Sequence, residues 1–249
     1  MRRGNASVNQ GRLMIVYKWL HYAQRAIFPP QCRLCLAPCA SQLSLCEDCR
    51  DELPWLTTTC NRCALPFAGA DGKDTCPACL AHPPILDSCY ALFSYQPPLD
   101  QWIHALKFGR DLAVARLLGQ LLVERLPPPN AHTHVLAVPL HPRRLRQRGY
   151  NQAAEIARPL LHRGWPSSDC SCYRKRHTQA QSALPARDRR GNLHGAFAVR
   201  RQLQGENILL IDDVMTTGAT LNEVAGVLKD AGAGRVDARV IARALMPGS

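Results

Sequence analysis

The sequence predicts an α/β domain with a largely parallel sheet, preceded by a small cysteine-rich lobe. From residue 87 onward, short apolar segments alternate with helical segments along the 249-residue chain. This alternation is typical of parallel sheets whose strands are joined by helices. Nine of the twelve cysteines lie before residue 80, in a lobe too short to have much of a hydrophobic core of its own. We therefore expect two domains with different roles.

Proline, glycine and hydrophobic periodicity define the expected elements. Pro83-Pro84 marks the end of the lobe, and Pro127-Pro128-Pro129 stops a helix because proline lacks the backbone N–H that a helix needs. Gly232 is the expected C-cap of the last helix. The expected elements are an amphipathic helix at 15–28, a strand at 89–95, helices at 99–108 and 112–126, a strand at 135–140, a helix at 151–161, a strand at 208–211, a helix at 220–231 and a strand at 236–244. The expected domains are a tail and helix over 1–31, the cysteine-rich lobe over 32–86 and the α/β domain over 87–249.

The cysteines of the lobe form four Cys-x-x-Cys pairs. The pairs are Cys32 with Cys35, Cys46 with Cys49, Cys60 with Cys63 and Cys76 with Cys79. Two such pairs complete a tetrahedral Cys₄ site, so the eight thiolates predict two Zn²⁺ ions in a double zinc ribbon. Four cysteine ligands leave no open position for a catalytic water, which makes both ions structural. Disulfides and an iron–sulfur cluster are the alternatives, and it stays open which pairs combine.

Positive charge is concentrated in one segment of the chain. The formal net charge is +12, and residues 141–201 hold 14 Arg and Lys against three acidic residues. The cysteine-rich lobe has four basic and six acidic residues, and zinc–thiolate sites make it more negative. A nucleic-acid backbone would avoid that lobe, so any contact with DNA is expected on the 141–201 side. We expect the lobe to dock a protein or to mediate dimerisation.

The apolar segments are too short for a membrane span. No stretch reaches about 18 uninterrupted apolar residues, the length that a spanning helix needs. The apolar run Leu13–Tyr17 is cut by Lys18 and His21 and has no small-residue cleavage site after it. We expect a soluble, cytoplasmic protein.

The segment Ile208–Thr220 combines features of a sugar-phosphate site. Four apolar residues predict a buried strand, Asp212 and Asp213 follow it, and small hydroxylic residues around Gly218 open a helix. Free backbone N–H groups at a helix N-terminus suit a phosphate, whereas adjacent carboxylates suit sugar hydroxyls and Mg²⁺. Because ligands of open α/β sheets bind beyond the carboxyl ends of the strands, these residues predict a ribose 5-phosphate site there.

The same segment resembles the 13-residue phosphoribosyl-pyrophosphate (PRPP) signature of type I phosphoribosyltransferases. The resemblance implies that Asp212 and Asp213 contact the ribose hydroxyls. It implies that the 5-phosphate is surrounded by Thr216, Thr217, Gly218, Ala219 and Thr220. It also implies a pyrophosphate loop after the strand at 135–140, with Arg143 and Arg144 as the cationic candidates. Lys107 is expected to approach this site, and residues 174–197, which include Arg176, resemble the hood that closes over it.

Nearly the whole chain resembles the ComF/GntX family, which joins a double zinc ribbon to a domain with the type I phosphoribosyltransferase fold. The matching segments include Leu106–Gly109, Val138–Arg146 and Arg148–Gln152, besides the PRPP signature. The resemblance implies a role in natural competence, in the handling of incoming single-stranded DNA. It also implies Mg²⁺ bound with PRPP and contacts with other competence proteins.

The residues leave more than one function open. As an enzyme, the protein would bind Mg²⁺–PRPP and transfer its ribose 5-phosphate to a nitrogen acceptor that the sequence does not identify. The expected catalytic residues are Asp212, Asp213, Arg143 and Arg144. Catalysis would depend mostly on positioning, with the charge of the departing pyrophosphate stabilised by arginine and Mg²⁺. The alternatives are a sensor that binds PRPP or a nucleotide without turnover and an adaptor for single-stranded DNA. A homo-oligomer is a further expectation.

Overall fold

The computed structural model describes residues 31–39, 43–67, 69, 74–129, 131–170, 172–176 and 195–245. The chain divides into two compact units between Leu53 and Pro54, and each unit is treated by itself below. The second cysteine tetrad therefore shares a unit with the sheet. The helix expected at 15–28 and the hood residues 177–194 lie outside the described residues.

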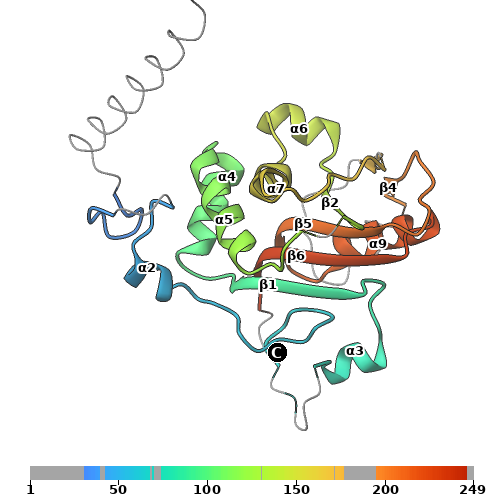
Figure 1. The fold of residues 1–249 in the computed structure, drawn as a ribbon, viewed down its shortest axis with the longest axis horizontal. Coiled ribbons are helices and arrows are strands. Elements are labelled where there is room, and N and C mark those ends of the chain that lie inside the picture. The colour runs from blue at the N-terminus through green and yellow to red at the C-terminus, as the bar shows by residue number, and fades with distance from the viewer. Residues whose placement is uncertain are drawn as a thin grey trace, which may run out of the picture. The chain divides into compact units, whose positions relative to one another are not determined.

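A four-stranded parallel sheet forms the centre of the larger unit (Figure 1). Its strands are β1 (Ser88–Ser94), β2 (Thr133–Ala137), β5 (Asn207–Met215) and β6 (Arg235–Arg243). They lie in the order β1-β6-β5-β2, and each neighbouring pair is parallel. The α/β class with a mostly parallel sheet is thus confirmed. A separate antiparallel ribbon pairs β3 (Tyr173–Arg174) with β4 (Phe197–Ala198).

The four helices predicted for the α/β part begin and end within two residues of their predicted bounds. They are α4 (Leu99–Phe108), α5 (Leu112–Glu124), α7 (Gln152–His162) and α9 (Ala219–Asp230). Local capping explains the bounds: Asn151 accepts a hydrogen bond from the N–H of Ala153 at the start of α7, and Gly232 adopts a φ of +100° just after α9. Two further helices, α2 (Glu47–Asp51) and α3 (Pro77–Ala81), are single turns.

The sheet separates two apolar layers. On β5, Ile208 and Leu210 pack in one cluster with α9 residues such as Leu221 and Val224. Because side chains alternate along a strand, the buried residues Leu209 and Ile211 point to the opposite face. There α7 packs on β5 and β2, and α5 packs on α7. Both faces of the central strands are therefore buried, which explains their nearly continuous apolar sequence.

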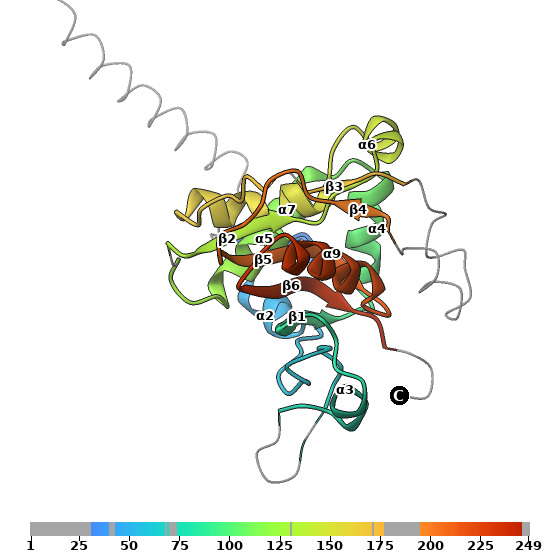
Figure 2. The ribbon, with the colours of Figure 1, turned by 90° about the vertical axis from the view of Figure 1, so that its right-hand side faces the viewer.

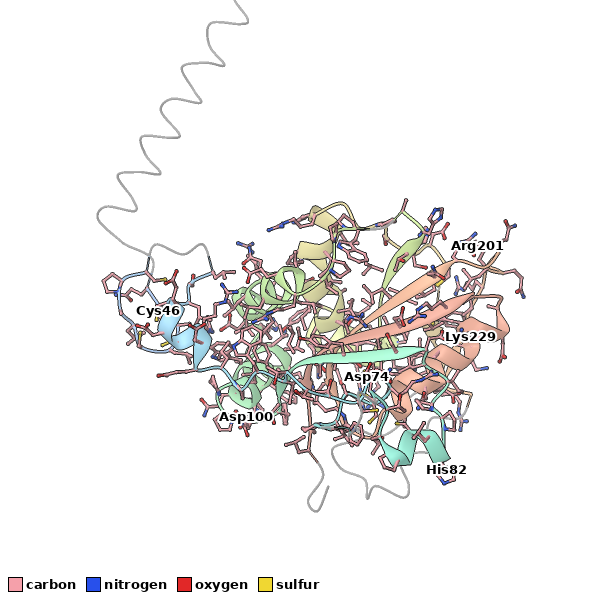
Figure 3. All side chains as sticks on the ribbon, turned by 60° about the horizontal axis from the view of Figure 1, so that its bottom comes forward. Cys46, Asp74, His82, Asp100, Arg201 and Lys229 are labelled. Atoms are coloured by element: carbon pink, nitrogen blue, oxygen red, sulfur yellow. The ribbon has the colours of Figure 1, made fainter. Side chains whose placement is uncertain are left out.

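Outside these layers, ion pairs join the ends of elements. Lys229 lies near the end of α9 (Figure 3). Its Nζ is 2.6 Å from Asp87 Oδ2 and donates a hydrogen bond of 3.0 Å to the carbonyl of Gly234. These contacts connect α9 to the residues just before β1 and β6.

Three segments differ from their predicted structure. The strand predicted at 135–140 is β2, which ends three residues earlier, at Ala137. The strand predicted at 208–211 continues to Met215, because Asp212, Val214 and Met215 pair with β6. The carboxylates therefore lie on the strand and not after it. The segment predicted as a pyrophosphate loop contains a helix, α6 (Pro142–Arg148), whose N-cap His141 accepts a hydrogen bond from the N–H of Arg143. Pro142, the first residue of α6, is compatible with a helix start because an N–H at this position would have no partner within the helix.

In the part of the chain that the structure describes, no helix has both the length and the apolar character needed to cross a membrane.

Gly119 permits the close approach of α5 and α7. A Cβ at this position would lie 2.3 Å from the carbonyl oxygen of Ile156 and 2.9 Å from the ring of Pro159. We expect Gly119→Ala to lower the free energy of unfolding by about 1–3 kcal/mol, because a packed backbone must move. Denaturant unfolding of the zinc-loaded protein measures the change.

Gly226→Ala on α9 is the matched control. Its Cβ would meet only Ile85 Cδ1, at 3.5 Å, so the helix preference of alanine should leave stability unchanged or raise it by up to about 1 kcal/mol. Equal effects of the two substitutions would contradict the assigned role of Gly119.

Candidate functional site

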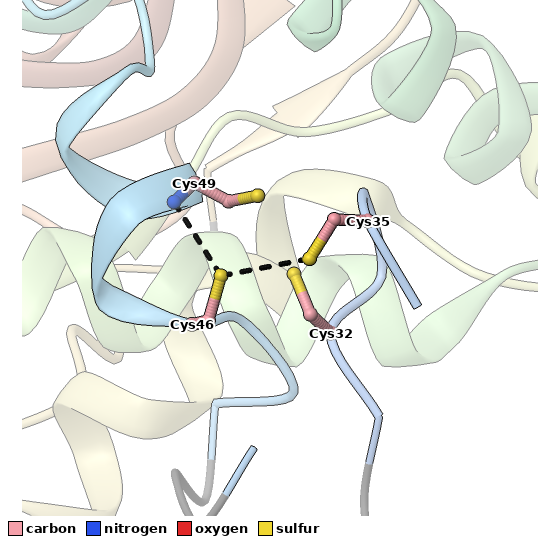
Figure 4. A group of neighbouring side chains, drawn as sticks. All are labelled: Cys32, Cys35, Cys46 and Cys49. Atoms are coloured by element: carbon pink, nitrogen blue, oxygen red, sulfur yellow. Dashed lines mark hydrogen bonds between the residues drawn. The ribbon is translucent and has the colours of Figure 1, made fainter. Parts of the chain in front are cut away.

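The first cysteine tetrad gathers four sulfur atoms around one point (Figure 4). Its members are Cys32, Cys35, Cys46 and Cys49, whose sulfurs lie within 4.8 Å of one another. The sulfurs of Cys35 and Cys46 are 3.7 Å apart. In a tetrahedron with Zn–S bonds of about 2.3 Å, the edge between two sulfurs is about 3.8 Å. The donor set and its spacing therefore fit a zinc ion.

The second tetrad repeats this arrangement within the larger unit. Its members are Cys60, Cys63, Cys76 and Cys79. The sulfurs of Cys63 and Cys76 are 3.8 Å apart, again the edge expected for zinc. Each tetrad combines two consecutive Cys-x-x-Cys pairs, which settles the pairing that the spacing left open.

Local backbone structure positions the cysteines of both tetrads. The first pair of each tetrad lies in a tight turn, closed by the N–H of Leu36 on the carbonyl of Cys32 and by the N–H of Ala64 on the carbonyl of Cys60. The second pair begins a short helix, with Cys46 or Cys76 as its N-cap.

Backbone N–H groups also point at the sulfur of Cys60. Arg62 and Cys76 donate to it at 3.5 and 3.3 Å. Burial alone would raise the pKa of Cys60, but these donors outweigh it and lower the pKa to about 7. Cys60 thus favours the thiolate form that zinc requires, whereas burial raises the pKa of the Cys63 thiol to about 11.

A cavity of about 700 Å³ lies at the carboxyl edge of the sheet. It is bounded by the ends of β5 and α4, the segment after β2, and α6. Its volume falls within the range of about 300–1,000 Å³ that is common for ligand pockets. The carboxyl edge of an open parallel sheet is where ligands bind, as the sequence predicted for the carboxylates.

Two adjacent carboxylates form the acidic part of the cavity. Asp213 is only 4% exposed, and its N–H donates to Asp212 Oδ1 at 2.9 Å. The N–H of Val214 donates to Asp213 Oδ1 at 2.7 Å, and Lys107 Nζ lies 3.0 Å from Asp213 Oδ2. Burial and the neighbouring charge of Asp213 raise the pKa of Asp212 to about 7, while Lys107 and Arg174 act against this. Ionisation of both carboxylates therefore depends on nearby cations.

Positive side chains outnumber the carboxylates around the cavity. The lining cations are Lys107, Arg110, Arg144, Arg148 and Arg174. Burial and the charge of Arg144 lower the pKa of Arg174 to about 10, and burial and Arg148 lower the pKa of Arg144. Crowded cations of this kind would be stabilised by an anion, so the cavity is suited to a ligand with several negative charges.

The cavity brings together many, but not all, of the predicted site residues. Those that line it are Lys107, Arg144, Asp212, Asp213, Thr216 and Thr220. Thr217, Gly218 and Ala219 form the turn into α9, where Gly218 has a φ of +77° and the N–H of Ala219 donates to Thr217 Oγ1. Arg143 and Arg176 are exposed and do not belong to the lining residues.

Several lining residues had not been singled out as site residues. Arg148 and Gln152 stand within the Arg148–Gln152 segment, which could have indicated them, whereas no sequence pattern pointed to Arg110. Gln152 is 6% exposed, and its Oε1 accepts no hydrogen bond within the described structure. A buried acceptor of this kind at a cavity wall is available to a donor group on a ligand.

Comparisons with known proteins agree with both parts of the chain. Residues 23–80 match a model of the double zinc ribbon domain, and residues 148–245 match a model of the phosphoribosyl transferase domain. DNA utilization protein YhgH of Salmonella typhimurium is 34% identical over 227 residues, which cover 87% of this chain and 98% of that protein. Competence protein F of Haemophilus influenzae is 30% identical, over 80% of this chain and 90% of that protein. Competence protein ComFC of Streptococcus pneumoniae is 31% identical, over 57% and 62%.

The two tetrads predict two zinc ions per chain. We expect Cys35→Ser and Cys63→Ser each to reduce the bound zinc from two ions to about one, because a tetrahedral site that loses one thiolate binds zinc much more weakly. Zinc content measured by elemental analysis after dialysis checks this. Cys172→Ser, outside both tetrads, should retain two ions, and retention of two ions by Cys63→Ser would contradict the assignment.

Proposed function

The chain belongs to the family of competence and DNA utilization proteins that join a double zinc ribbon to a phosphoribosyltransferase domain, and on this basis we propose that its cavity binds Mg²⁺–PRPP. The observation that supports the proposal most is the pair of carboxylates, Asp212 and Asp213, at the end of β5 within a cavity lined by five cations. In a ribose that carries phosphate groups, the hydroxyls match the carboxylates and the phosphates match the cations.

Each part of the ligand has candidate partners. Asp212 and Asp213 would accept hydrogen bonds from the ribose hydroxyls and hold the hydrated Mg²⁺, which supplies positive charge to the pyrophosphate. Thr216 and Thr220 line the side of the cavity where α9 begins, and would donate to the 5-phosphate. Arg144 and Arg174 would bind the pyrophosphate, since guanidinium groups make paired, charge-assisted hydrogen bonds.

As an enzyme, the protein would break the bond between ribose C1 and pyrophosphate and join C1 to a nitrogen of the acceptor. The side chains would contribute by holding the ribose in place and by stabilising the negative charge that grows on the departing pyrophosphate. Lys107, whose Nζ lies 3.0 Å from Asp213 Oδ2, would balance the charge of that carboxylate.

Calorimetry with Mg²⁺–PRPP tests the proposal. The zinc-loaded wild type should bind it, and the double variant Asp212→Asn, Asp213→Asn should bind at least about ten-fold more weakly, since it loses two charged hydrogen-bond acceptors. Asp230→Asn, at the end of α9, is the control and should bind like the wild type. Absence of binding to the wild type would refute the proposal.

Turnover is a separate question from binding. An enzyme should release pyrophosphate from PRPP in the presence of its acceptor, and a panel of nucleobases and amines tests this. Binding of PRPP without release across the panel would favour a non-catalytic sensor.

We further propose that the protein handles single-stranded DNA, a role in accord with the names of its relatives. A specific structural feature supports this. Phe108 is 68% exposed at the cavity, and the guanidinium of Arg148 lies 5.6 Å from the centre of its ring. The exposed Arg143 and Arg146 lie on the same helix, α6, as Arg148. Aromatic rings beside arginines bind unstacked bases, and the arginines attract the phosphate backbone.

Substitution of Phe108 tests the DNA contact. We expect Phe108→Ala to weaken binding of a dT oligonucleotide by about five-fold to 100-fold at constant salt, because one base loses its stacking partner. Fluorescence anisotropy measures the affinity. Leu80→Ala, an equally exposed apolar residue of α3 in the acidic cysteine-rich lobe, is the control and should have no effect. If Phe108→Ala and wild type bind equally well, the base-stacking role is wrong.

A further inference from the structure

Arg243, at the end of β6, connects the second cysteine tetrad to the loop after β5. The residue is 3% exposed. Its Nε donates a hydrogen bond of 2.8 Å to the carbonyl of Cys63, a member of the tetrad. Its Nη1 donates to the carbonyls of Met215 at 3.1 Å and Ala244 at 2.7 Å, and to that of Thr216. One guanidinium therefore contacts a zinc ligand and the first residues of the loop that leads into α9.

The second tetrad also affects the charge of Arg243. A buried guanidinium is costly unless it is hydrogen-bonded and its charge is balanced. Burial lowers the pKa of Arg243, and the groups that act against this are the sulfurs of Cys63, Cys89 and Cys79. A zinc ion with four thiolates has a net charge of −2, so the metal-loaded tetrad would supply a counter-charge to Arg243.

A second series of contacts, which does not involve Arg243, also connects the tetrad to the loop after β5. Asn61, inside the first turn of the tetrad, accepts a hydrogen bond of 2.8 Å from the N–H of Cys89 on β1. The sulfur of Cys89 lies 3.4 Å from that of Met215. The Met215 methyl group packs over Gly218, where a Cβ would lie 2.6 Å from it.

In both views of the fold, α3 lies on the side of the sheet where β1 is the edge strand (Figures 1 and 2). The turn of the tetrad thus contacts Arg243 and Cys89, and Arg243 in turn contacts Thr216, which lines the cavity.

We propose that Arg243 is a positioning residue that couples the second zinc site to the phosphate loop, Thr216–Thr220. Zinc holds the turn at Cys60–Cys63 in one conformation, this turn presents the Cys63 carbonyl to Arg243, and Arg243 in turn holds the Thr216 carbonyl so that the loop keeps its N–H groups and hydroxyls toward the cavity. The coupling concerns the ligand of the proposed function and rests on that proposal.

Coupling between two binding sites is reciprocal. If zinc in the second tetrad improves the affinity for Mg²⁺–PRPP by some factor, then Mg²⁺–PRPP improves the affinity for that zinc by the same factor. Allosteric couplings commonly have factors of about 5 to 150. The zinc of the first tetrad, in the other compact unit, serves as an internal reference.

Zinc release measures the coupling in one direction. In a Cys35→Ser background, which retains only the second zinc, a colorimetric chelator should remove the ion at least about five-fold more slowly when Mg²⁺–PRPP is saturating. In the complementary Cys63→Ser background, release of the first zinc should not change. If the wild type binds Mg²⁺–PRPP but the second zinc is released at the same rate with and without it, the coupling is wrong and the proposed function stands.

Variants of Arg243 test the residue itself. Arg243→Met should retain two zinc ions, bind Mg²⁺–PRPP at least about five-fold more weakly and lose the protection of the second zinc. Arg239→Met is the matched control, because Arg239 lies on the same strand and contacts Ser88 and Ala238 instead of the loop. Equal effects of the two variants on PRPP affinity would overturn the role of Arg243.

Hydrogen exchange provides a readout that needs neither PRPP nor the variants. Removal of the second zinc should speed amide exchange in a peptide covering residues 215–222, relative to a peptide from α5. Unchanged exchange in that peptide would overturn the proposal even if Arg243→Met fails to fold or the wild type does not bind PRPP.

Discussion

Two neighbouring carboxylates at a buried strand end impose a charge requirement on their surroundings. Asp212 and Asp213 lie side by side on β5, and Asp213 is almost fully buried. Such a pair is stable only where positive charge is close, because each carboxylate disfavours ionisation of the other. Lys107 from α4 and Arg174 from β3 meet this need from two separate parts of the chain. The excess of cations then makes the cavity receptive to an anion.

This requirement explains why the basic segment of the chain lies where it does. Composition alone suggests a basic, cysteine-rich protein that binds nucleic acid through its zinc modules. These features belong to different segments, because the cysteine-rich lobe has six acidic and four basic residues, whereas Arg144, Arg148 and Arg174 of 141–201 line the cavity. A phosphorylated sugar and a nucleic-acid backbone share the same phosphate chemistry. One basic surface can therefore serve both proposed ligands.

The two cysteine tetrads have the same local backbone structure but lie in different compact units. In each, a tight turn and a helix N-cap present four sulfurs to one ion, and this design depends only on residues close in sequence. The first tetrad lies in the compact unit Met1–Leu53, whose described residues bury few apolar side chains, and bound zinc would add stability there. The second lies in the unit that contains the sheet, and Arg243 and Cys89 connect it to residues of the site. Zinc there can contribute to a binding site without contacting a ligand.

Features that depend on local spacing follow from the amino-acid sequence alone. The Cys-x-x-Cys pairs, the helix at 99–108 with its bounds and the glycine after α9 follow from neighbouring residues, so the structure agrees with them. Tertiary structure decided what depends on distant partners. The end of β5 is set by its pairing with β6, which extends the strand to Met215, and α6 replaces an expected loop. The same holds for the cavity wall, where Arg174 and Gln152 take part while Arg143 does not. Arg243 contacts Cys63 from 180 positions away, and a sequence pattern cannot specify that pairing because it arises only when the sheet and the tetrad are packed together.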